Sequence, residues 1–436
     1  MIQVLVDGPS LQVTDRQALD PGVIAMKTTN HWRQQISSAL KKKNLTASNP
    51  QENQREGSVL TVSAGVLVMV LAFTSFTVDL GWIALTLAEM HNACDAAALA
   101  AASEFGPGTG VAPTLTADGV ADTSKNAART VASANSSGGL DSTYIDVSQD
   151  VRLGQYQWLP GEQRWAEVWG VAPYTLVEIT VHRDRGSAHD INGEMLDGPL
   201  PLFFGPVIGH LDAGLNVSSA AAIMPSVGFR IASGSSSRAA VLPIALDETS
   251  WTDMLAGAGS DEYGYNTGLG KVEESPDGIL EVNLYPSGSS SMPPGNRGTV
   301  DIGSPGNSTA DLKRQIKEGV NDSDLAWFGG ELRFDNVPLE LNGDTGLSAG
   351  IEAALKEIIG ETRAIPLFTS VSGPGNNATY VISRFVGVRI LDVRLTGNPS
   401  KRRVVIQPAP FSDSTAIRGN TEIRSDSIFT TPVLIR

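Results

Sequence analysis

One apolar run dominates the hydrophobic pattern of the chain. From Ser58 to Val78 no side chain carries a charge. A helix needs about 20 mostly apolar residues to cross the hydrocarbon core of a bilayer. Within a single segment, only a helix can satisfy its own backbone hydrogen bonds in that environment. The pattern therefore predicts one transmembrane helix over these residues.

The helical pattern continues after the apolar run. Asp79 marks the water interface, and beyond it apolar residues recur every three or four positions, which is one stripe of a helix. The stripe consists of Leu80, Ile83, Leu87, Met90, Cys94, Ala97 and Ala101. Glycine and proline at residues 106–108 end the pattern. We expect the transmembrane helix to extend into an Ala-rich helix whose stripe is packed against a partner.

The rest of the chain alternates between strand and helix patterns. Period-two alternation predicts an antiparallel meander, and the apolar positions interleaved with polar ones suit a half-buried sheet. The three strands of this meander are predicted at residues 151–158, 165–169 and 175–182. Further strands are predicted at 200–208, 279–285, 380–395 and 403–407, and helices at 117–134, 308–320 and 347–360.

These elements predict an α+β protein with a single N-terminal transmembrane helix and a mainly antiparallel β region. Residues 1–56 are expected to form a largely disordered cytoplasmic tail, and Met26 is an alternative start to Met1. Residues 57–105 form the transmembrane helix and its Ala-rich extension. Residues 106–436 form an extracytoplasmic α+β region, for which a division near residues 235–245 is left open.

Charge sets the expected orientation and excludes some partners. Lys41, Lys42, Lys43 and Arg55 precede the apolar run, and the next lysine or arginine is Lys125. The positive-inside rule therefore places the N-terminus in the cytoplasm and the chain after Val78 outside. The net charge of −15 argues against a nucleic-acid partner. The single cysteine excludes an internal disulfide.

Three short motifs carry a resemblance to a known family. They are Gly57-Ser58-Val59, Val78-Asp79-Leu80-Gly81 and Asn92-Ala93-Cys94-Asp95-Ala96-Ala97-Ala98-Leu99-Ala100. At this spacing around an apolar run they resemble the N-terminal motif of TadG-like proteins in the TadE/TadG family. A weaker similarity in the order of segments continues to residue 221. The resemblance implies a membrane-anchored structural or assembly component of a tight-adherence (Flp-type) pilus, or of a related secretion system, in the inner membrane.

The same resemblance suggests partners for the Ala-rich helix. The stripe could pack on the chain's own sheet region or on the matching helix of another pilus-assembly subunit. The flexible linker after residue 105 favours the subunit, and self-association is left open. Under that interpretation, glutamate at Ala97 and Ala101 would abolish assembly without changing the melting temperature of the rest. The lipid bilayer is the other expected partner.

Candidate chemistry is sparse. His182, Asp184, His189 and Asp190 have the residue types of a metal site, but a solvated loop is the favoured interpretation. Asp344-Thr345-Gly346 resembles one aspartic-protease triplet, yet a second copy is absent, so a turn before a helix is favoured. The segment 146–150 lacks the second serine of a von Willebrand A-type metal site. We therefore expect no catalytic, cofactor-binding or metal-binding residue, and no enzyme.

Two features leave alternatives open. Five aromatic residues could stack on a sugar, although core filling is the default for such side chains; they are Tyr156, Trp158, Trp165, Trp169 and Tyr174. Cys94 is expected to be a small buried hydrophobe, with an intermolecular disulfide as the alternative. The alternative function is accordingly a membrane-tethered extracytoplasmic hydrolase or a glycan-binding surface protein.

Overall fold

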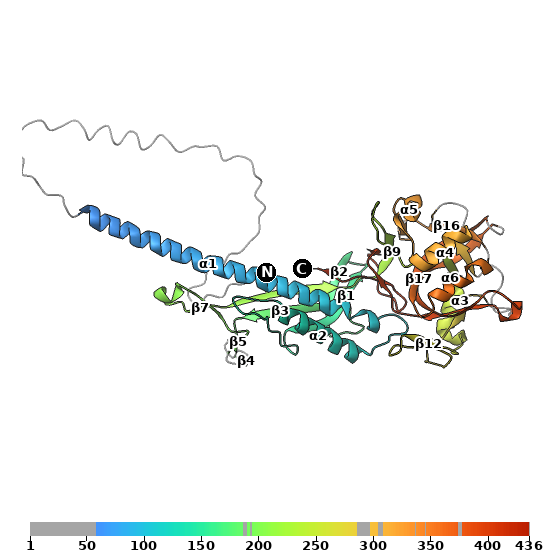
Figure 1. The fold of residues 1–436 in the computed structure, drawn as a ribbon, viewed down its shortest axis with the longest axis horizontal. Coiled ribbons are helices and arrows are strands. Elements are labelled where there is room, and N and C mark those ends of the chain that lie inside the picture. Colours follow the sequence, from blue (N-terminus) through green and yellow to red (C-terminus); the bar gives the residue numbers. More distant parts are fainter. Residues whose placement is uncertain are drawn as a thin grey trace, which may run out of the picture. The chain divides into compact units, whose positions relative to one another are not determined.

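The computed structural model describes residues 58–185, 190–191, 194–285, 297–303, 308–335, 337–344, 346–373 and 377–435. These residues divide into two compact units. The anchor unit consists of residues 58–82 and Pro201–Ala213, and the head unit consists of Ile83–Leu200 and residues 214–435. Helix α1 (Ser58–Ser103) contributes residues to both units (Figure 1). The predicted tail and the choice between Met1 and Met26 lie outside the described residues.

The predicted fold class is confirmed. One long apolar helix is followed by a mostly antiparallel β region with several helices, so the chain is α+β overall. The predicted end of α1 is also confirmed, since α1 stops at Ser103 and a short 3-10 helix, η1 (Gly106–Gly108), follows it. Proline at the first turn of η1 suits its fixed φ angle.

The first sheet of the head unit has five antiparallel strands in the order β2-β1-β3-β8-β23. Their bounds are β1 Val151–Leu159, β2 Arg164–Trp169, β3 Leu176–Arg183, β8 Leu215–Ala222 and β23 Val433–Leu434. The three predicted strands exist, but the predicted meander is wrong, because β1 lies between β2 and β3. The first four residues of β3 are all buried, which suits an interior strand, whereas the half-buried β2 lies at the edge.

Helix α2 (Ala117–Ser133) packs beside α1 in the head unit. Its N-cap is Thr116, whose hydroxyl accepts a hydrogen bond from the Gly119 N–H at 3.2 Å. Its buried side is lined by small side chains, and the Ser124 hydroxyl donates to the Ala101 carbonyl at 3.0 Å. The predicted helix over residues 117–134 is therefore confirmed, and it contacts the end of α1.

The second sheet of the head unit closes on itself. Its seven strands run in the order β13-β19-β18-β16-β14-β10-β17, and β17 also pairs with β18. The strands are β10 Ile244–Asp247, β13 Val282–Asn283, β14 Arg297–Val300, β16 Leu339–Asp344, β17 Thr362–Ser372, β18 Ala378–Arg394 and β19 Arg403–Pro408. All these pairs are antiparallel except β10–β17.

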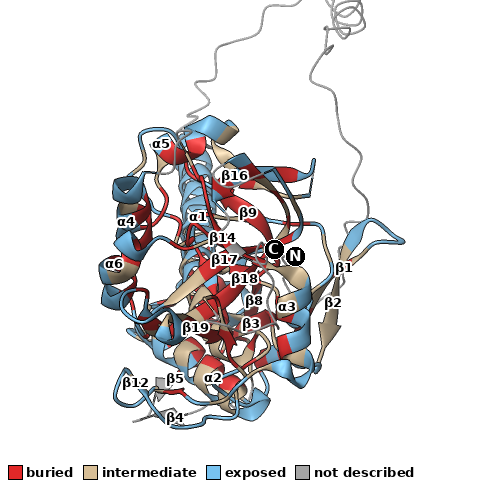
Figure 2. Cartoon of the chain, turned by 90° about the vertical axis from the view of Figure 1, so that its right-hand side faces the viewer, coloured by how far each residue is buried: buried red, intermediate tan, exposed pale blue. Residues whose placement is uncertain are grey.

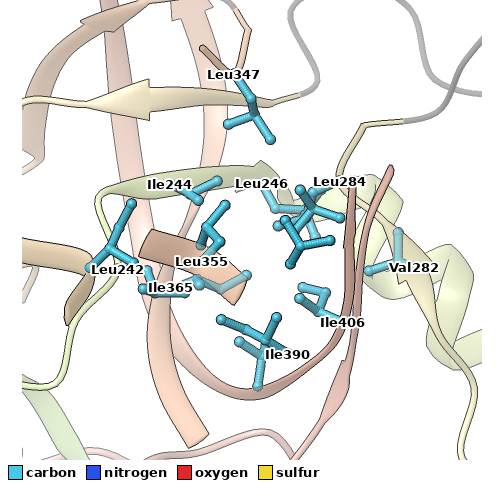
Figure 3. Packing of buried hydrophobic residues seen from close by; sticks show 14 of the residues in the cluster. Leu242, Ile244, Leu246, Val282, Leu284, Leu347, Leu355, Ile365, Ile390 and Ile406 are labelled. Carbon is cyan, nitrogen blue, oxygen red and sulfur yellow. The ribbon is translucent and has the colours of Figure 1, made fainter. Parts of the chain in front are cut away.

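Alternate residues of these strands serve two hydrophobic cores. Ile244 and Leu246 of β10 belong to one core, and Ala245 between them belongs to the other. Helices α3 (Glu248–Asp253), α4 (Thr309–Glu318) and α6 (Glu352–Glu357) contribute to the first core. Figure 3 shows strand side chains gathered around Leu355 of α6. In Figure 2, α4 and α6 are exposed on their outward faces, while β18 and the middle of β17 are largely buried.

Shorter elements complete the described chain. The strands are β4 Asp190–Ile191, β5 Glu194–Met195, β6 Leu200–Pro201, β7 Asp212–Ala213, β9 Ser226–Arg230, β11 Gly264–Asn266, β12 Lys271–Glu273, β15 Glu331–Arg333, β20 Ser412–Asp413, β21 Ala416–Arg418 and β22 Phe429–Thr430. The helical turns are η2 Gly205–Ile208, η3 Met254–Ala258, α5 Asp322–Leu325, η4 Ala326–Phe328, η5 Ala349–Ile351 and η7 Pro399–Lys401. The strand predicted at 200–208 is therefore wrong beyond β6, because Gly205 and Pro206 begin a 3-10 turn.

The carboxylate of Glu352, at the start of α6, is expected to stabilise the fold at neutral pH and to lose this effect in acid. Its carboxylate accepts hydrogen bonds from Lys356 Nζ at 2.6 Å and from the Leu395 N–H at 3.2 Å. The hydrogen bond from Lys356, followed by one from Thr396, lowers the pKa of Glu352 from 4.5 to about 2. A lowered pKa means that the stabilisation is present above pH 4.5 and is lost as the pH falls towards 2.

We expect this loss to be about 1–2 kcal/mol of unfolding free energy, since the pair lies at the surface. The measurement is the unfolding free energy of the detergent-solubilised full chain between pH 6 and pH 2, for the wild type and for Glu352→Gln. The difference between the two proteins should shrink as the pH falls. A difference that does not change with pH would contradict the assignment.

Candidate membrane anchor

The apolar half of α1 has no protein covering it within the described residues. Large side chains from Val59 to Val78 are exposed, among them Leu60 at 79% and Phe73 at 67%. The most apolar window of this helix has a mean hydropathy of 2.2, and none of it is buried. A core helix of a water-soluble protein would instead be largely covered. The described residues therefore contain one candidate membrane-spanning helix, as the sequence predicts.

Three hydroxyl groups near the end of this stretch form hydrogen bonds within the helix itself. Thr74 donates to the Val70 carbonyl at 2.8 Å, and Ser75 donates to the Leu71 carbonyl at 2.7 Å. Thr77 makes the same contact four residues back. Such bonds remove the need for water at these side chains, which suits a lipid environment.

Asp79 binds a distant loop at the end of the apolar stretch. Its side chain is nearly buried, at 7% exposure. Oδ1 accepts the Phe203 N–H at 2.9 Å, and Oδ2 accepts the Gly205 N–H at 2.7 Å. The Phe204 N–H contacts both oxygens, at 3.2 and 3.1 Å. Three backbone donors thus stabilise a carboxylate that would otherwise be costly to bury.

The loop that binds Asp79 is itself closed. The Leu202 N–H donates to the Leu211 carbonyl at 3.1 Å, and the His210 N–H donates to the Gly205 carbonyl at 3.0 Å. A Cβ at Gly205 would lie 2.4 Å from the His210 oxygen, so this close approach requires glycine. The Trp82 ring lies 5.6 Å from the Phe203 ring, centroid to centroid. The sequence placed Asp79 at an interface but did not indicate these partners, which lie 124 to 126 residues away.

In the head unit, the Ala-rich stripe packs on the first sheet. Met90, Cys94, Ala97 and Ala101 are fully buried. Cys94 Sγ donates to the Ile179 carbonyl of β3 at 3.2 Å and lies 3.6 Å from the Val217 carbonyl of β8. Beside it, the Ser219 hydroxyl of β8 donates to Asp95 Oδ1 at 2.5 Å.

The stripe therefore has its partner within the chain. The preference for a second subunit on this stripe is wrong, and the alternative, the chain's own sheet, is correct. Alanine side chains let a helix approach a β-sheet closely, as they do in packing between two helices. Periodicity alone predicted correctly the burial of Met90, Cys94, Ala97 and Ala101, but Leu80 at the start of the stripe is 48% exposed. It did not indicate what covers the buried part.

Because Cys94 is buried, its thiol is expected to react slowly in the folded protein. A thiol with no exposed surface is shielded from reagents and from a second chain. We expect the native full chain in detergent to resist a maleimide, and to be labelled fully in denaturant. Mass spectrometry before and after denaturation measures this. Rapid native labelling, or a disulfide-linked dimer through Cys94, would contradict the packing.

A polar cluster ties α1 to loops of the head unit. Arg183, at the end of β3, is 3% exposed. Its guanidinium donates to the Ser137 carbonyl at 2.6 Å and to the Gly198 carbonyl at 2.9 Å. The Gly138 N–H donates to Glu89 Oε2 of α1 at 2.8 Å. Burial lowers the pKa of Arg183 from its usual range. This cluster could not be predicted from the sequence, because its members lie far apart and no motif marks them.

Two of the four residues considered for a metal site, His182 and Asp184, contact each other. His182 Nδ1 lies 2.9 Å from Asp184 Oδ1, and Asp184 Oδ2 accepts from Asn216 at 2.9 Å. His189 lies outside the described residues, and so does the side chain of Asp190. No group of three or more His, Cys, Asp or Glu residues among those described is arranged to hold a metal ion.

The other sequence candidates lie at separate places in the head unit. Asp344 ends β16, and its carbonyl accepts from the Tyr380 hydroxyl at 3.2 Å; Thr345 is outside the described residues. Asp146 and Asp150 close a local turn, in which the Asp146 N–H donates to Asp150 Oδ2 at 2.8 Å. Asp150 also binds Arg185. None of these contacts joins Asp344 and His182 in a common site.

The aromatic residues of the first sheet contact one another. The Tyr156 and Trp165 rings stack with centroids 4.9 Å apart, and Trp158 lies 5.6 Å from Trp165. Arg152 lies over the Trp169 ring at 4.4 Å. Tyr174 precedes β3. These contacts account for the cluster as packing, and sugar binding by it stays a prediction.

Comparison with known proteins matches only the region of α1. Residues 57–104 match the Tad family model, which is described as Flp pilus-assembly TadE/G-like. No curated protein and no solved structure matches the chain. The matched region contains the exposed apolar stretch, Asp79 and the buried stripe. The resemblance seen in the sequence is thus confirmed, and the chain carries a TadE/G-like segment of the Flp pilus-assembly type at residues 57–104.

Proposed function

We propose that this protein is a membrane-anchored structural component in the assembly of a tight-adherence (Flp-type) pilus or a related secretion system. The proposal rests on two features that occur in the same segment, a family match and an exposed apolar surface. The segment that matches the TadE/G-like family is the same segment whose apolar side chains are exposed. An exposed apolar helix of this kind holds a protein in a bilayer. The similarity to the TadE/G-like family suggests that the anchored protein acts in pilus assembly.

We further propose the orientation and the division of the chain. The basic residues before the helix favour a cytoplasmic N-terminus in the inner membrane. Residues 1–56 would then be a cytoplasmic tail, 57–105 the transmembrane helix and its extension, and 106–436 the extracytoplasmic region. An active reporter enzyme fused after Gly110 on the extracytoplasmic side would agree with this orientation. Activity only in the cytoplasm would reverse it.

The exposed apolar side of α1 is the surface that we assign to partners. The Ala-rich stripe is covered by β3 and β8, so it is not available to another subunit. Residues 59–78 face outward on all sides, and in a bilayer they would contact lipid, the helices of other pilus-assembly proteins, or a second copy. The proposed role is structural, and no residue is assigned to catalysis.

Deletion of the gene tests the proposed function. We expect pili to disappear from the cell surface in electron micrographs, while the other assembly proteins stay at their normal levels in immunoblots. The wild-type chain supplied in trans should restore them. A matched pair of variants locates the effect: Leu67→Arg should fail to restore pili and Leu67→Ile should succeed, because a central arginine opposes membrane insertion by about 2.5–3.5 kcal/mol. Normal piliation in the deletion strain would refute the proposal.

A further inference from the structure

The loop Pro201–Ala213 of the anchor unit exposes an unusually large number of apolar side chains for so short a segment. Phe203 is 63% exposed, Phe204 42%, Val207 84%, Ile208 73% and Leu211 69%. Single exposed apolar residues are ordinary on a protein surface, but a contiguous group of this kind marks an interaction site. The loop contains no lysine or arginine, and its one acidic residue, Asp212, lies near its end.

The position of the loop indicates what covers these side chains. Phe203, Phe204 and Gly205 donate their N–H groups to Asp79, the first charged residue after the apolar stretch of α1. The loop is therefore held at the point where the helix would leave the bilayer. In Figure 1 its light-green tip extends beside α1 towards the beginning of that helix. Exposed apolar residues flank this contact in both segments: Val78 and Leu80 on α1, and Phe203 and Phe204 on the loop.

The backbone of the loop is also suited to an environment with little water. Many of its N–H groups donate to protein acceptors rather than to solvent, and Pro206 has none to satisfy. The donors are Leu202, Phe203, Phe204, Gly205, Val207, Gly209 and His210. A surface loop in water has no need for this degree of internal pairing. In the headgroup region of a bilayer it lowers the cost of burying the polypeptide backbone.

We propose that this loop is a second, interfacial membrane anchor. Its five apolar side chains enter the boundary between headgroups and acyl chains, in the leaflet from which α1 emerges. Asp79 fixes the loop at this depth, which gives the Asp-Leu-Gly motif at the end of the apolar stretch a physical role. This inference rests on the proposed membrane anchoring by α1, and it adds lipid as the ligand of a region outside the matched segment.

The test measures lipid contact at single positions of the full chain. In a Cys94→Ala background, one cysteine is introduced and labelled with an environment-sensitive fluorophore, and the protein is placed in lipid nanodiscs. The positions are Val207→Cys in the loop, Leu71→Cys in the apolar stretch and Leu269→Cys in the head unit, and all three residues are exposed. Quenching by nitroxide lipids is compared with quenching by aqueous iodide.

We expect the labels at 207 and 71 to lose most of their emission to nitroxide lipids and little to iodide, and the label at 269 to show the reverse. If 71 is quenched by lipid while 207 behaves like 269, the loop lies in water and the inference fails, although the anchor stands. If 207 is shielded from both quenchers, protein covers the loop, and the inference also fails. If 71 is not quenched by lipid, the proposed anchor itself is wrong.

A second pair of variants tests the role of Asp79. Asp79→Ala removes the acceptor of the three N–H groups, so the label at 207 should become accessible to iodide while the label at 71 stays in lipid. Asp212→Ala is the matched control, because Asp212 lies in the same loop and is exposed. Unchanged quenching at 207 in Asp79→Ala would show that Asp79 does not hold the loop in the membrane.

Discussion

Glutamate at Ala97 is expected to unfold the head unit. Ala97 has no exposed surface and belongs to the stripe that α1 packs against β3 and β8. A carboxylate at this position would be buried without a partner, which costs several kcal/mol, and its extra atoms have no space. Folded proteins of this kind have only about 5–15 kcal/mol of total stability. The double change Ala97→Glu with Ala101→Glu should leave little native protein.

The measurement is thermal unfolding of the detergent-solubilised full chain, together with near-ultraviolet circular dichroism for side-chain packing. Asn92→Glu is the control, because Asn92 lies on the same helix and is exposed. It adds the same charge and should leave the unfolding temperature nearly unchanged. If Ala97→Glu also keeps the native unfolding temperature, the stripe is not packed in the head unit. This expectation reverses the one drawn from the sequence, under which the head unit would be spared.

The difference between the two expectations shows what local patterns can predict. The length of α1, its apolar half and its buried stripe all follow from side-chain spacing along one helix. The start of α4 is equally local, since the Ser308 hydroxyl accepts from the Asp311 N–H three residues later. Features of this range are visible in a sequence because the interacting residues lie within a turn of each other.

The arrangement of strands depends on contacts that no local pattern records. The strand predictions near β1, β2 and β3 were correct in place, but their order was not, because burial on both faces decides which strand is central. The closure of the second sheet arises from pairing of β17 with both β10 and β18. Alternation of apolar and polar residues predicts that a strand exists and has two different faces. It does not determine which strands pair with it.

In the candidate anchor, too, some features could be predicted from the sequence and others could not. The apolar stretch was predicted from composition, and the charge of Asp79 correctly marked its end. The loop that binds Asp79 could not be predicted, because backbone N–H groups carry no sequence signal and every residue type except proline supplies them. Its apolar side chains instead suggested a strand at residues 200–208. The exposure of Val207 and Ile208 is what separates a membrane-facing loop from such a strand.

Methionine at Arg183 is expected to destabilise the head unit by about 3 kcal/mol or more. The guanidinium is buried and donates to the carbonyl groups of Ser137 and Gly198. Methionine has a similar length but no donor, so both carbonyl groups would lose a charged partner without gaining access to water. The change would also loosen the turn at Gly138, whose N–H binds Glu89 of α1.

Arg164→Met is the matched control, since Arg164 is 58% exposed and its partner Glu162 is 57% exposed. Exposed ion pairs contribute about 0–1 kcal/mol, so this variant should unfold close to the wild type. Chemical denaturation of both variants in detergent gives the two free energies under the same conditions. Glu89→Gln should lie between them, because its amide oxygen can still accept from Gly138. Equal stabilities for the two methionine variants would mean that the Arg183 contacts do not hold α1 to the head unit. A large loss for Arg183→Met alone would identify this cluster, together with the Ala-rich stripe, as what fixes the helix in the fold.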